Sequence, residues 1–358
     1  MIAGGGTGGH IYPAIAIGRA LMKQDSSCSV RFIGTAEGLE KKIMARENLP
    51  LDLILSGKLN FSGRWLQKIK TLIKIPLGFI QSFLLILKHR PDFVLGVGGY
   101  ASAPFLLMAS VLRVPRALWE PNAHSGMANR ILSKVVPKAY LVFDEAQKYL
   151  SCNSYQVYGM PLRAEIDDAQ EKFKFGDQKK SDKFTILCFG GSQGSLFLNE
   201  QLSNLILAHP EWHHEIRVVH QTGSLGLEAM KKKYGHLSCV EIFEFIYDMP
   251  TYYQKADVMF CRGGASTIAE AAAFGVVPLV VPLPAADNHQ QKNAEVLVKN
   301  EAGFLFHQNE FNLENFYQCV LKLKNDLSFR QQISENLKKL APHKAASAIA
   351  KDILKQLL

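Results

Sequence analysis

Several features that define common protein classes are missing from this chain. Its six cysteines are scattered, and no two of them form a Cys-x-x-Cys pair. This pattern excludes a disulfide framework and a zinc site of that type, and it predicts reduced core thiols in a cytosolic protein. No apolar stretch reaches the roughly 20 residues that span a bilayer, and no signal peptide is recognisable. An Asp-x-Asp pair that could hold a divalent cation is also lacking, so we expect no metal in the chemistry.

The 358 residues are too many for one ordinary core and favour two domains. The net charge of +9 is unevenly distributed. Residues 1–160 hold 19 Lys and Arg against 9 Asp and Glu, whereas residues 161–358 hold 22 against 23. The excess predicts an anionic partner for the N-terminal half: nucleic acid, an anionic membrane or a phosphorylated substrate. A merely solubilising surface is the alternative interpretation.

Short apolar runs alternate with helix-like runs, which predicts an α/β protein with parallel sheets. The expected strands are 29–35, 51–56, 93–97, 116–120, 138–143, 155–158, 184–189, 216–221, 239–245, 257–261, 277–282 and 303–306. The expected helices are 11–23, 64–75, 102–112, 195–208, 225–234, 266–274, 288–300, 312–325 and the amphipathic tail 344–358. The polar, charged stretch 164–183 is expected to link the domains.

Two glycine-rich loops, 4–9 (GGGTGG) and 190–194 (GGSQG), each follow a strand-like run and precede a helix-like run. Glycine allows a backbone to turn sharply and approach a ligand, and the following helix N-terminus attracts phosphate. The two loops therefore predict two α/β lobes that face one anionic ligand. Only three residues precede Gly4, so either the first strand is very short or the natural chain begins upstream. We expect the second.

The spacing Gly4-x-Gly6-x-x-Gly9, with Glu37 after the next strand, also fits a dinucleotide-binding fingerprint. The short first strand and the early His10 and Pro13 weigh against that interpretation. A further glycine cluster, 96–104 (GVGGYASAP), follows another strand and is expected either to be a tight turn or to bind a second anion. Glu120, in Trp119-Glu120-Pro121-Asn122, is expected either at the ligand-facing edge or as a helix cap or surface acid.

The run 261–293 carries the most chemical information. Gly263-Gly264 predicts a turn, and Ser266 or Thr267 then starts a helix whose N–H groups suit a diphosphate. Glu270 lies one turn further on the same face, where a carboxylate can accept hydrogen bonds from a ribose diol. Gln290 and Asn293 share a face of the next helix. Each feature alone fits capping or a surface position, whereas together they predict a nucleotide site.

These clusters, GGTGGHIYPA, GVGGYASAP, EPN, GMPLR, GGSQGS, CRGGASTIAEAAAFG and DNHQQKNA, resemble in order and spacing the MurG family of UDP-N-acetylglucosamine (UDP-GlcNAc) transferases. The resemblance covers nearly the whole chain. It implies the GT-B architecture, two Rossmann-like domains whose parallel sheets face an interdomain cleft. We expect an acceptor and membrane-side domain at 1–162, on which 344–358 packs back, and a UDP-GlcNAc-binding domain at 163–343.

The resemblance also assigns residues. In the C-terminal domain the donor contacts are expected from Ser192, Ile246 (through its backbone, to uracil), Ala265, Ser266, Thr267, Ile268, Ala269, Glu270 (to the ribose), Gln290 and Asn293. From the N-terminal domain Thr7, Gly8, Gly9, Asn122 and Arg163 are expected to close over the donor. Gly98, Gly99 and Tyr100 are expected to bind the acceptor. His10 and Glu120 match the positions of a catalytic base or acceptor contact, and which of them is the base stays open.

The implied reaction is an inverting transfer of GlcNAc to the 4-hydroxyl of undecaprenyl-diphospho-MurNAc-pentapeptide, the lipid-linked precursor of peptidoglycan, without cofactor or metal. The alternatives are another GT-B enzyme that uses UDP-GlcNAc, a UDP-GlcNAc 2-epimerase, and a nucleotide-binding protein without transfer activity. The charge also allows nucleic acid, but no motif interleaves the cations with aromatic residues, so we expect no nucleic-acid partner.

Membrane contact is predicted from region 64–90. The stretch 75–87 is uncharged, interrupted by Pro76 and Gly78, and flanked by Arg64, Lys68, Lys70, Lys74, Lys88 and Arg90. Thirteen residues are too few to span a bilayer, but such a stretch suits the surface of an anionic leaflet. Residues 75–80 favour that surface, whereas 82–87 favour a buried helix. Together with this stretch, the resemblance to the MurG family implies a peripheral protein at the cytoplasmic face of the bacterial inner membrane.

Overall fold

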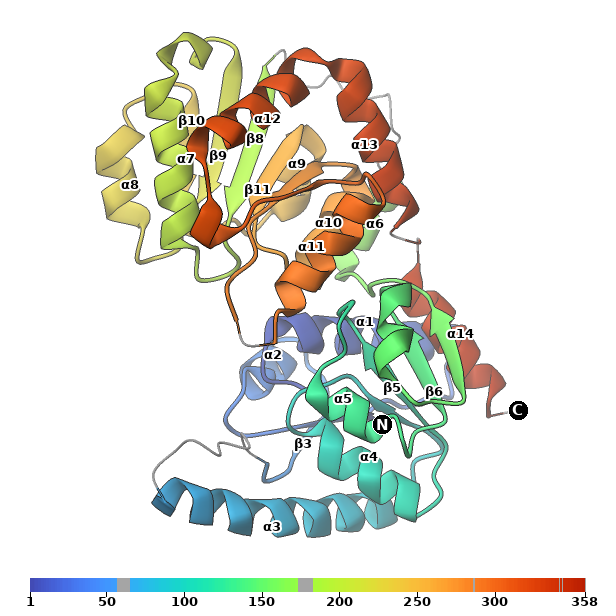
Figure 1. Ribbon diagram of the computed structural model, residues 1–358. Helices are drawn as coiled ribbons and strands as arrows, with labels where there is room; N and C mark the ends of the chain where they lie inside the picture. The colour runs from blue at the N-terminus through green and yellow to red at the C-terminus, as the bar shows by residue number, and fades with distance from the viewer. Residues whose placement is uncertain (57–64, 173–182, 286, 341, 343, 358) are drawn as a thin grey trace. The chain divides into compact units, whose positions relative to one another are not determined.

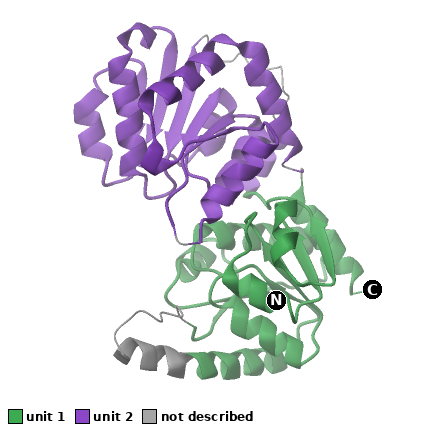
Figure 2. Ribbon diagram, viewed as in Figure 1, with its two compact units in different colours: residues 1–163, 344–358 green, residues 164–343 purple. Residues whose placement is uncertain are grey.

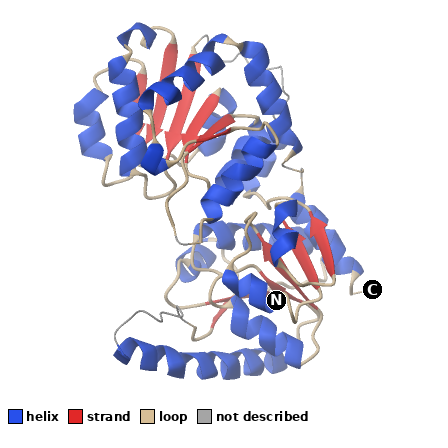
Figure 3. Cartoon of the chain, in the orientation of Figure 1, coloured by secondary structure: helices blue, strands red, loops and turns tan. Residues whose placement is uncertain are grey.

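The computed structural model describes residues 1–56, 65–172, 183–285, 287–340, 342 and 344–357, with the backbone alone for 65–74. The chain divides into two compact units, which are coloured separately in Figure 2. Unit 1 comprises residues 1–163 and 344–358, and unit 2 comprises residues 164–343. Each unit is built on one parallel sheet with helices packed against it (Figure 3).

The sheet of unit 1 has the strand order β3-β2-β1-β4-β5-β6-β7 among the described residues. Its strands are β1 (Ile2–Ala3), β2 (Phe32–Gly34), β3 (Leu51–Leu53), β4 (Val94–Gly96), β5 (Arg116–Glu120), β6 (Lys138–Leu141) and β7 (Ser154–Val157). Its helices are α1 (Gly8–Gln24), α2 (Glu40–Arg46), α3 (Trp65–His89), α4 (Ser102–Val111), α5 (Met127–Leu132), the 3-10 helix η1 (Asp144–Tyr149) and α14 (Ala345–Lys355) (Figure 1). The very short β1 nevertheless occupies a central place, between β2 and β4.

The sheet of unit 2 has the order β10-β9-β8-β11-β12-β13 among the described residues. Its strands are β8 (Phe184–Phe189), β9 (Ile216–Gln221), β10 (Val240–Phe243), β11 (Val258–Cys261), β12 (Val277–Val280) and β13 (Phe304–Leu305). Its helices are α6 (Ala164–Lys172), α7 (Leu196–Ala208), η2 (Pro210–Trp212), α8 (Leu227–Tyr234), α9 (Met249–Lys255), α10 (Ala265–Phe274), α11 (His289–Lys299), η3 (Gln308–Glu310), α12 (Leu313–Asn325) and α13 (Leu327–Lys339). Every residue of β8 and β11 is buried, because helices cover both faces of a parallel sheet.

The structure corrects two of the sequence predictions. The first part of the expected linker is helix α6, whose Ile166 is fully buried, while residues 173–182 lie outside the described part. Pro76 and Gly78 do not interrupt the apolar stretch, because α3 runs through both positions. The short helices α2, α5 and α9 and the longer α13 were not predicted.

Helix α3 presents an apolar face to solvent over its described part. Leu77, Ile80, Leu84 and Leu87 are between 41% and 56% exposed, and their spacing places them on one helical face. Ser82 and Ile86 are buried, as expected for 82–87, but Phe83, Leu84 and Leu87 of the same segment are exposed, which was not expected. Arg64 lies outside the described residues, as do the side chains of Lys68, Lys70 and Lys74.

The last helix, α14, packs on α1 of unit 1. Ala345, Ala346, Ile349, Ala350 and Ile353 form its buried face. The Gln24 side chain donates to the Ser347 carbonyl and hydroxyl, at 2.8 Å each. Asp352 pairs with Lys138 and accepts a hydrogen bond of 2.7 Å from the Tyr140 hydroxyl. The chain thus returns to unit 1 after it has completed unit 2.

Candidate functional site

In unit 2 the strand order reverses between β8 and β11, which are neighbours although β9 and β10 come between them in sequence. Loops that follow two such strands diverge and leave a crevice at the carboxyl edge of the sheet, where α/β proteins bind ligands. The loop 190–195 follows β8, and the loop 262–264 follows β11. The two glycine turns that the sequence predicts for unit 2 therefore both lie where the strand order reverses.

Glycine is required where the loops after β8 and β9 touch. Gly194 and Gly223 have φ angles of +76° and +75°. A Cβ atom on Gly194 would lie 1.9 Å from the Thr222 carbonyl oxygen, and one on Gly223 would lie 2.0 Å from that of Gln193. Because these neighbours are backbone atoms, no side-chain movement relieves the clash. The exposed Ser192 lies at the tip of the first loop.

Helix α10 begins at Ala265, and its N-cap residue Gly264 has no side chain that could cap it. The first intrahelical bond runs from the Ile268 N–H to the Gly264 carbonyl, at 3.0 Å. The N–H groups of Ala265, Ser266 and Thr267 precede that bond and have no acceptor within the helix, so this terminus favours an anion. Ala265, Ile268 and Ala269 are buried, so of 265–269 the partly exposed side chains are those of Ser266 and Thr267. The buried residues Ala265, Ile268 and Ala269 can contact a ligand only through their backbone groups.

Glu270 lies one helical turn beyond Ser266 and is partly exposed. Its Oε2 accepts a 2.8 Å hydrogen bond from the hydroxyl of Tyr253, a buried residue of α9. This bond fixes the orientation of the carboxylate, whose oxygens are hydrogen-bond acceptors. The arrangement suits a ligand with adjacent hydroxyl groups.

Gln290 and Asn293, which the family resemblance assigned to the donor site, hold the loop after β11. The Gln290 Oε1 accepts hydrogen bonds from the N–H groups of Gly263 (3.2 Å) and Leu283 (2.9 Å). The Asn293 Nδ2 donates to the Gly263 carbonyl at 3.1 Å, and Asn293 is fully buried. The geometry therefore gives Asn293 a positioning role, whereas Gln290, which is partly exposed, both positions the loop and borders the crevice.

Ile246 follows β10 and has a buried side chain. Its N–H donates to the Gln221 Oε1 at 2.8 Å. Since this donor is engaged within the protein, a backbone contact from Ile246 to a base is left to its carbonyl oxygen.

In unit 1 the strand order reverses between β1 and β4. The loops after these strands, 4–7 and 97–101, contain the other two glycine clusters and pack directly on each other. The Gly5 N–H donates to the Gly98 carbonyl at 3.2 Å. The buried Ser102 hydroxyl donates to the Ala3 carbonyl (2.6 Å) and accepts from the Gly98 N–H (3.0 Å). Gly99 has a φ of +78°, and its Cβ would lie 2.2 Å from the Gly5 oxygen.

The residues that the sequence assigned to unit 1 gather around these loops. His10 lies in the first turn of α1, partly exposed, and its ring would contact a Cβ on Gly98 at 2.8 Å. It also meets the Trp119 ring edge-on, with centroids 6.4 Å apart. Thr7 and Gly9 are exposed at the start of α1, with Gly8 between them, and Tyr100 is 43% exposed. Arg163 lies over the ring of Tyr12, 5.7 Å from its centroid.

Glu120 is only 1% exposed, so it is neither a surface acid nor an open ligand contact. Its Oε1 accepts from the Asn122 N–H (3.0 Å) and side-chain amide (3.4 Å). Its Oε2 accepts from the Gly126 N–H (3.2 Å) and the Asn129 amide (2.9 Å). Burial raises the pKa of this carboxyl from 4.5 to about 7, against the opposite effect of these hydrogen bonds. Glu120 thus shapes the loop that carries Asn122.

Three polar residues of unit 2 that the sequence analysis did not single out connect the loops of the carboxyl edge. Arg262 donates to the Ser195 hydroxyl (2.8 Å) and to the carbonyls of Val281 (3.1 Å) and Pro282 (3.2 Å). Gln221 bonds to Gly191 in the loop after β8 and to Ile246 in the loop after β10. Tyr253 orients the Glu270 carboxylate of α10. For Gln221 and Arg262 the available signal was a polar residue at or directly after the end of a buried strand, as in IRVVHQ and VMFCR, whereas Tyr253 lies within α9 and had no such signal.

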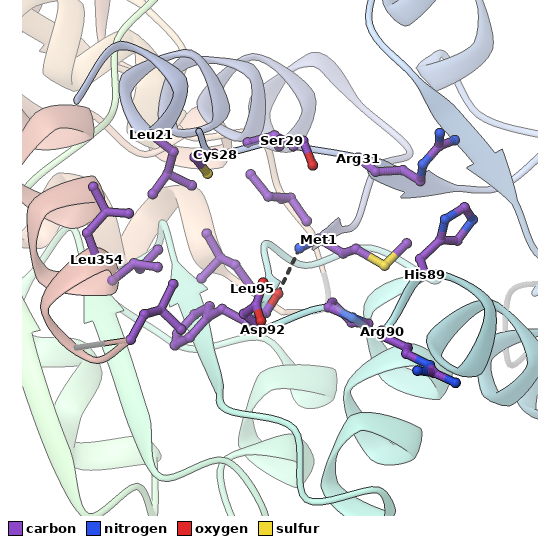
Figure 4. Close-up of a pocket in the computed structure, with 16 residues that line it drawn as sticks. Met1, Leu21, Cys28, Ser29, Arg31, His89, Arg90, Asp92, Leu95 and Leu354 are labelled. Atoms are coloured by element: carbon purple, nitrogen blue, oxygen red, sulfur yellow. Dashed lines mark hydrogen bonds between the residues drawn. The ribbon is translucent and has the colours of Figure 1, made fainter. Parts of the chain in front are cut away.

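A cavity of about 270 Å³ lies at the opposite, amino edge of the unit 1 sheet (Figure 4). Leu21, Leu95 and Leu354 line one side of it, and Arg31, His89 and Arg90 lie on the other. The Met1 amino group donates to the Phe93 carbonyl there, at 2.7 Å. This cavity is at the start of β2 and β4, whereas the glycine loops follow strand ends, so it is not part of the candidate site.

The described residues contain neither a metal-binding cluster nor a helix that could span a membrane. No group of three His, Cys, Asp or Glu side chains in that part of the chain is placed to hold a metal ion. No helix found there is long and apolar enough to cross a membrane. The six cysteines are free thiols, and Cys152, Cys188, Cys239 and Cys261 are buried.

Comparison with known proteins identifies the class. The glycosyltransferase family 28 N-terminal domain matches residues 1–141, and the family 28 C-terminal domain matches residues 185–357. Together with the two Rossmann-like units, these matches define a glycosyltransferase of the GT-B class, as the sequence predicted.

The relatives narrow the class to one family. The chain is 52% identical over 355 residues to the UDP-N-acetylglucosamine–N-acetylmuramyl-(pentapeptide) pyrophosphoryl-undecaprenol N-acetylglucosamine transferase of Bdellovibrio bacteriovorus, covering 99% of this chain and 98% of the relative. It is 35% identical over 356 residues to the enzyme of that name from Geobacter sulfurreducens, covering 99% and 97%. The crystal structure of Acinetobacter baumannii MurG superposes with a TM-score of 0.80 at 26% identity, covering 99% and 98%. The chain belongs to the MurG family, which confirms the predicted resemblance.

Proposed function

We propose that this chain transfers N-acetylglucosamine from UDP-GlcNAc to the 4-hydroxyl of undecaprenyl-diphospho-MurNAc-pentapeptide, with inversion at the anomeric carbon. The observation that carries the proposal is the 52% identity to the Bdellovibrio transferase, because it extends over 99% of the chain and hence over both units. The product is the disaccharide lipid from which peptidoglycan is made.

We assign the donor to the carboxyl edge of unit 2. The open N–H groups at the start of α10 and the Ser192 loop receive the diphosphate, and Glu270, held by Tyr253, accepts hydrogen bonds from the ribose. The backbone of the loop that carries Ile246 is assigned to uracil. Gln290 keeps the loop after β11 in place beside the sugar. The contributions of Thr7, Gly8, Gly9, Asn122 and Arg163 to donor binding stay predictions.

We assign the acceptor to the two packed glycine loops of unit 1, with Gly98, Gly99 and Tyr100 at its edge. The acceptor hydroxyl attacks the anomeric carbon, its proton passes to a base, and the bond to UDP breaks. N–H donors at the diphosphate stabilise the charge that develops on the leaving group. His10 is the better candidate for the base, because the two oxygens of Glu120 already accept four hydrogen bonds.

Replacing His10 with Ala tests this assignment. Loss of a general base lowers rates by roughly 10²–10⁴-fold. We expect a fall of that order in kcat with little change in the KM for UDP-GlcNAc. An unchanged kcat would assign the proton transfer to another group or to solvent.

We further propose that the protein binds the cytoplasmic face of the inner membrane through α3. The support is its exposed apolar face, Leu77, Ile80, Leu84 and Leu87, next to Lys88 and Arg90. Apolar residues flanked by cations favour an anionic lipid surface.

One assay tests the function: UDP release from UDP-GlcNAc with and without the lipid acceptor, both in excess EDTA. Release that requires the lipid supports the transferase, and full activity in EDTA supports chemistry without a metal. Free UDP with 2-epimerised sugar would identify an epimerase, and nucleotide binding without turnover would identify a binding protein. Activity that is lost in EDTA and restored by Mg²⁺ would contradict the metal-independent mechanism.

A further inference from the structure

Gln221 is the last residue of β9 and is only 3% exposed. It lies between Phe189, the last residue of β8, and Phe243, the last residue of β10. Its side chain can therefore reach the loops that follow both neighbouring strands. No motif of the sequence analysis included this residue.

The side-chain amide of Gln221 contacts both of those loops. Its Nε2 donates to the Gly191 carbonyl at 2.9 Å, and its Oε1 accepts from the Ile246 N–H at 2.8 Å. A carbonyl needs a donor and an N–H needs an acceptor, so the two backbone partners fix the orientation of the amide. The Gly194 N–H also donates to the Gly191 carbonyl, at 3.1 Å, which closes the turn around the same oxygen.

These two bonds determine where two further backbone groups point. In a planar trans peptide the C=O and N–H groups are antiparallel. The Gly191 carbonyl points at Gln221, so the N–H of Ser192, in the same peptide, points away from it. Likewise the Ile246 N–H points at Gln221, so the Phe245 carbonyl points away. Gln221 thus fixes one donor and one acceptor that point away from its own amide group.

We propose that Gln221 is a positioning residue of the donor site, which holds loop 190–194 for the phosphates and loop 244–248 for the base. This inference rests on the proposed function. The Ser192 N–H is suited to a phosphate oxygen, and the Phe245 carbonyl is suited to the N3–H of uracil. Cytosine has no proton on N3, so the fixed carbonyl favours uridine over cytidine nucleotides.

The test compares Gln221→Met, which keeps the length but removes both hydrogen bonds, with Asn199→Leu as the control. Asn199 is an equally buried amide of unit 2 that bonds the Thr222 carbonyl (3.0 Å) and His220 (2.9 Å) but neither of the two loops. The measurements are kcat and KM for UDP-GlcNAc with saturating lipid acceptor, Kd for UDP and CDP by calorimetry, and Tm.

We expect Gln221→Met to raise the UDP-GlcNAc KM and the UDP Kd about tenfold, with kcat within about threefold of wild type, since each of the two neutral hydrogen bonds is worth roughly a factor of 2 to 13. The preference for UDP over CDP should fall in the same variant. Asn199→Leu should lower Tm comparably but change the nucleotide affinities less than threefold.

Gln221→Glu provides a rescue by pH. A protonated carboxyl can donate to Gly191 and accept from Ile246, whereas the carboxylate can only accept, and burial raises the pKa of such a group. Relative to wild type at the same pH, its KM should approach normal at pH 6 and rise at pH 9. This variant also decides the question if Gln221→Met does not fold.

Three results would overturn the inference: an unchanged KM in folded Gln221→Met, equal nucleotide effects in Asn199→Leu, or equal weakening of UDP and CDP. If Gln221→Glu is the deciding variant, a KM that does not depend on pH relative to wild type has the same meaning. A wild-type protein that binds no UDP would instead refute the proposed function.

Discussion

At Glu120, burial and hydrogen bonding act on one carboxyl group in opposite directions. Burial is the larger effect and raises the pKa from 4.5 to about 7. The folded state therefore binds this proton more tightly than the unfolded state. Its contribution to the free energy of unfolding is fully present below pH 4.5 and is lost as the pH rises through 7.

Glu120→Gln should remove this dependence. Between pH 4.5 and 7 the unfolding free energy of the wild type should fall relative to the variant by about 3 kcal/mol, because one pKa unit corresponds to about 1.4 kcal/mol. Urea unfolding of both proteins at a series of pH values measures the difference. Parallel curves would show that Glu120 titrates alike in the folded and unfolded states.

The sequence was most informative where one residue type permits only one conformation. The glycine loops and short apolar strands were predicted because sharp turns and fully buried strands leave few alternatives. The partner of a polar side chain was harder to predict. Gln290 and Asn293 share a helical face as expected, but that spacing does not reveal that the face meets Gly263. Gln221 was missed because a polar residue at the end of a buried strand does not reveal which loops its side chain contacts.

Among the connecting elements, the two glycine loops of unit 1 allow a sharp test of close packing. Gly99→Ala would place a Cβ 2.2 Å from the Gly5 oxygen, at a φ of +78°. Strain at such a backbone position costs about 1–3 kcal/mol, and the displaced loops border the proposed acceptor site. We expect lower stability in urea unfolding and at least a tenfold loss of kcat/KM.

Gly126→Ala is the matched control, because Gly126 has a φ of −61° and no atom within 4 Å of the added Cβ. It should retain both stability and activity. If the two variants behave alike, the contact between the loops is not what requires glycine at position 99.

Helix α3 makes a separate prediction about membranes. Ile80→Glu and Leu84→Glu place a charge on residues that are 54% and 56% exposed, so folding should be unaffected. Removing one buried Leu or Ile from lipid should weaken binding at least tenfold, since each contributes about 1.5–3 kcal/mol. Sedimentation with anionic vesicles measures this, and Leu225→Glu, at an 83% exposed position of unit 2, is the control. Vesicle binding that survives in both α3 variants would contradict a role for this face.

At the scale of the whole molecule, unit 1 depends on a helix that the chain makes after unit 2. Ile349→Ala, in the buried face of α14, should lower the stability of unit 1 by about 2–5 kcal/mol. Hydrogen exchange should show faster opening of α1 and its sheet with little change in unit 2, whereas Lys351→Ala, exposed on the same helix, should have no effect. Equal acceleration in both units would mean that they unfold as one.

The return of the chain also sets an order of events at the ribosome. Residues 1–163 emerge first, but the helix that covers α1 follows only after residues 164–343 have been translated. At about 5–20 residues per second, this interval is roughly 10–40 s. Throughout it the nascent first unit displays the apolar surface of α1 that α14 later covers. Synthesis of α14, rather than completion of the first sheet, is therefore the step that ends this exposure.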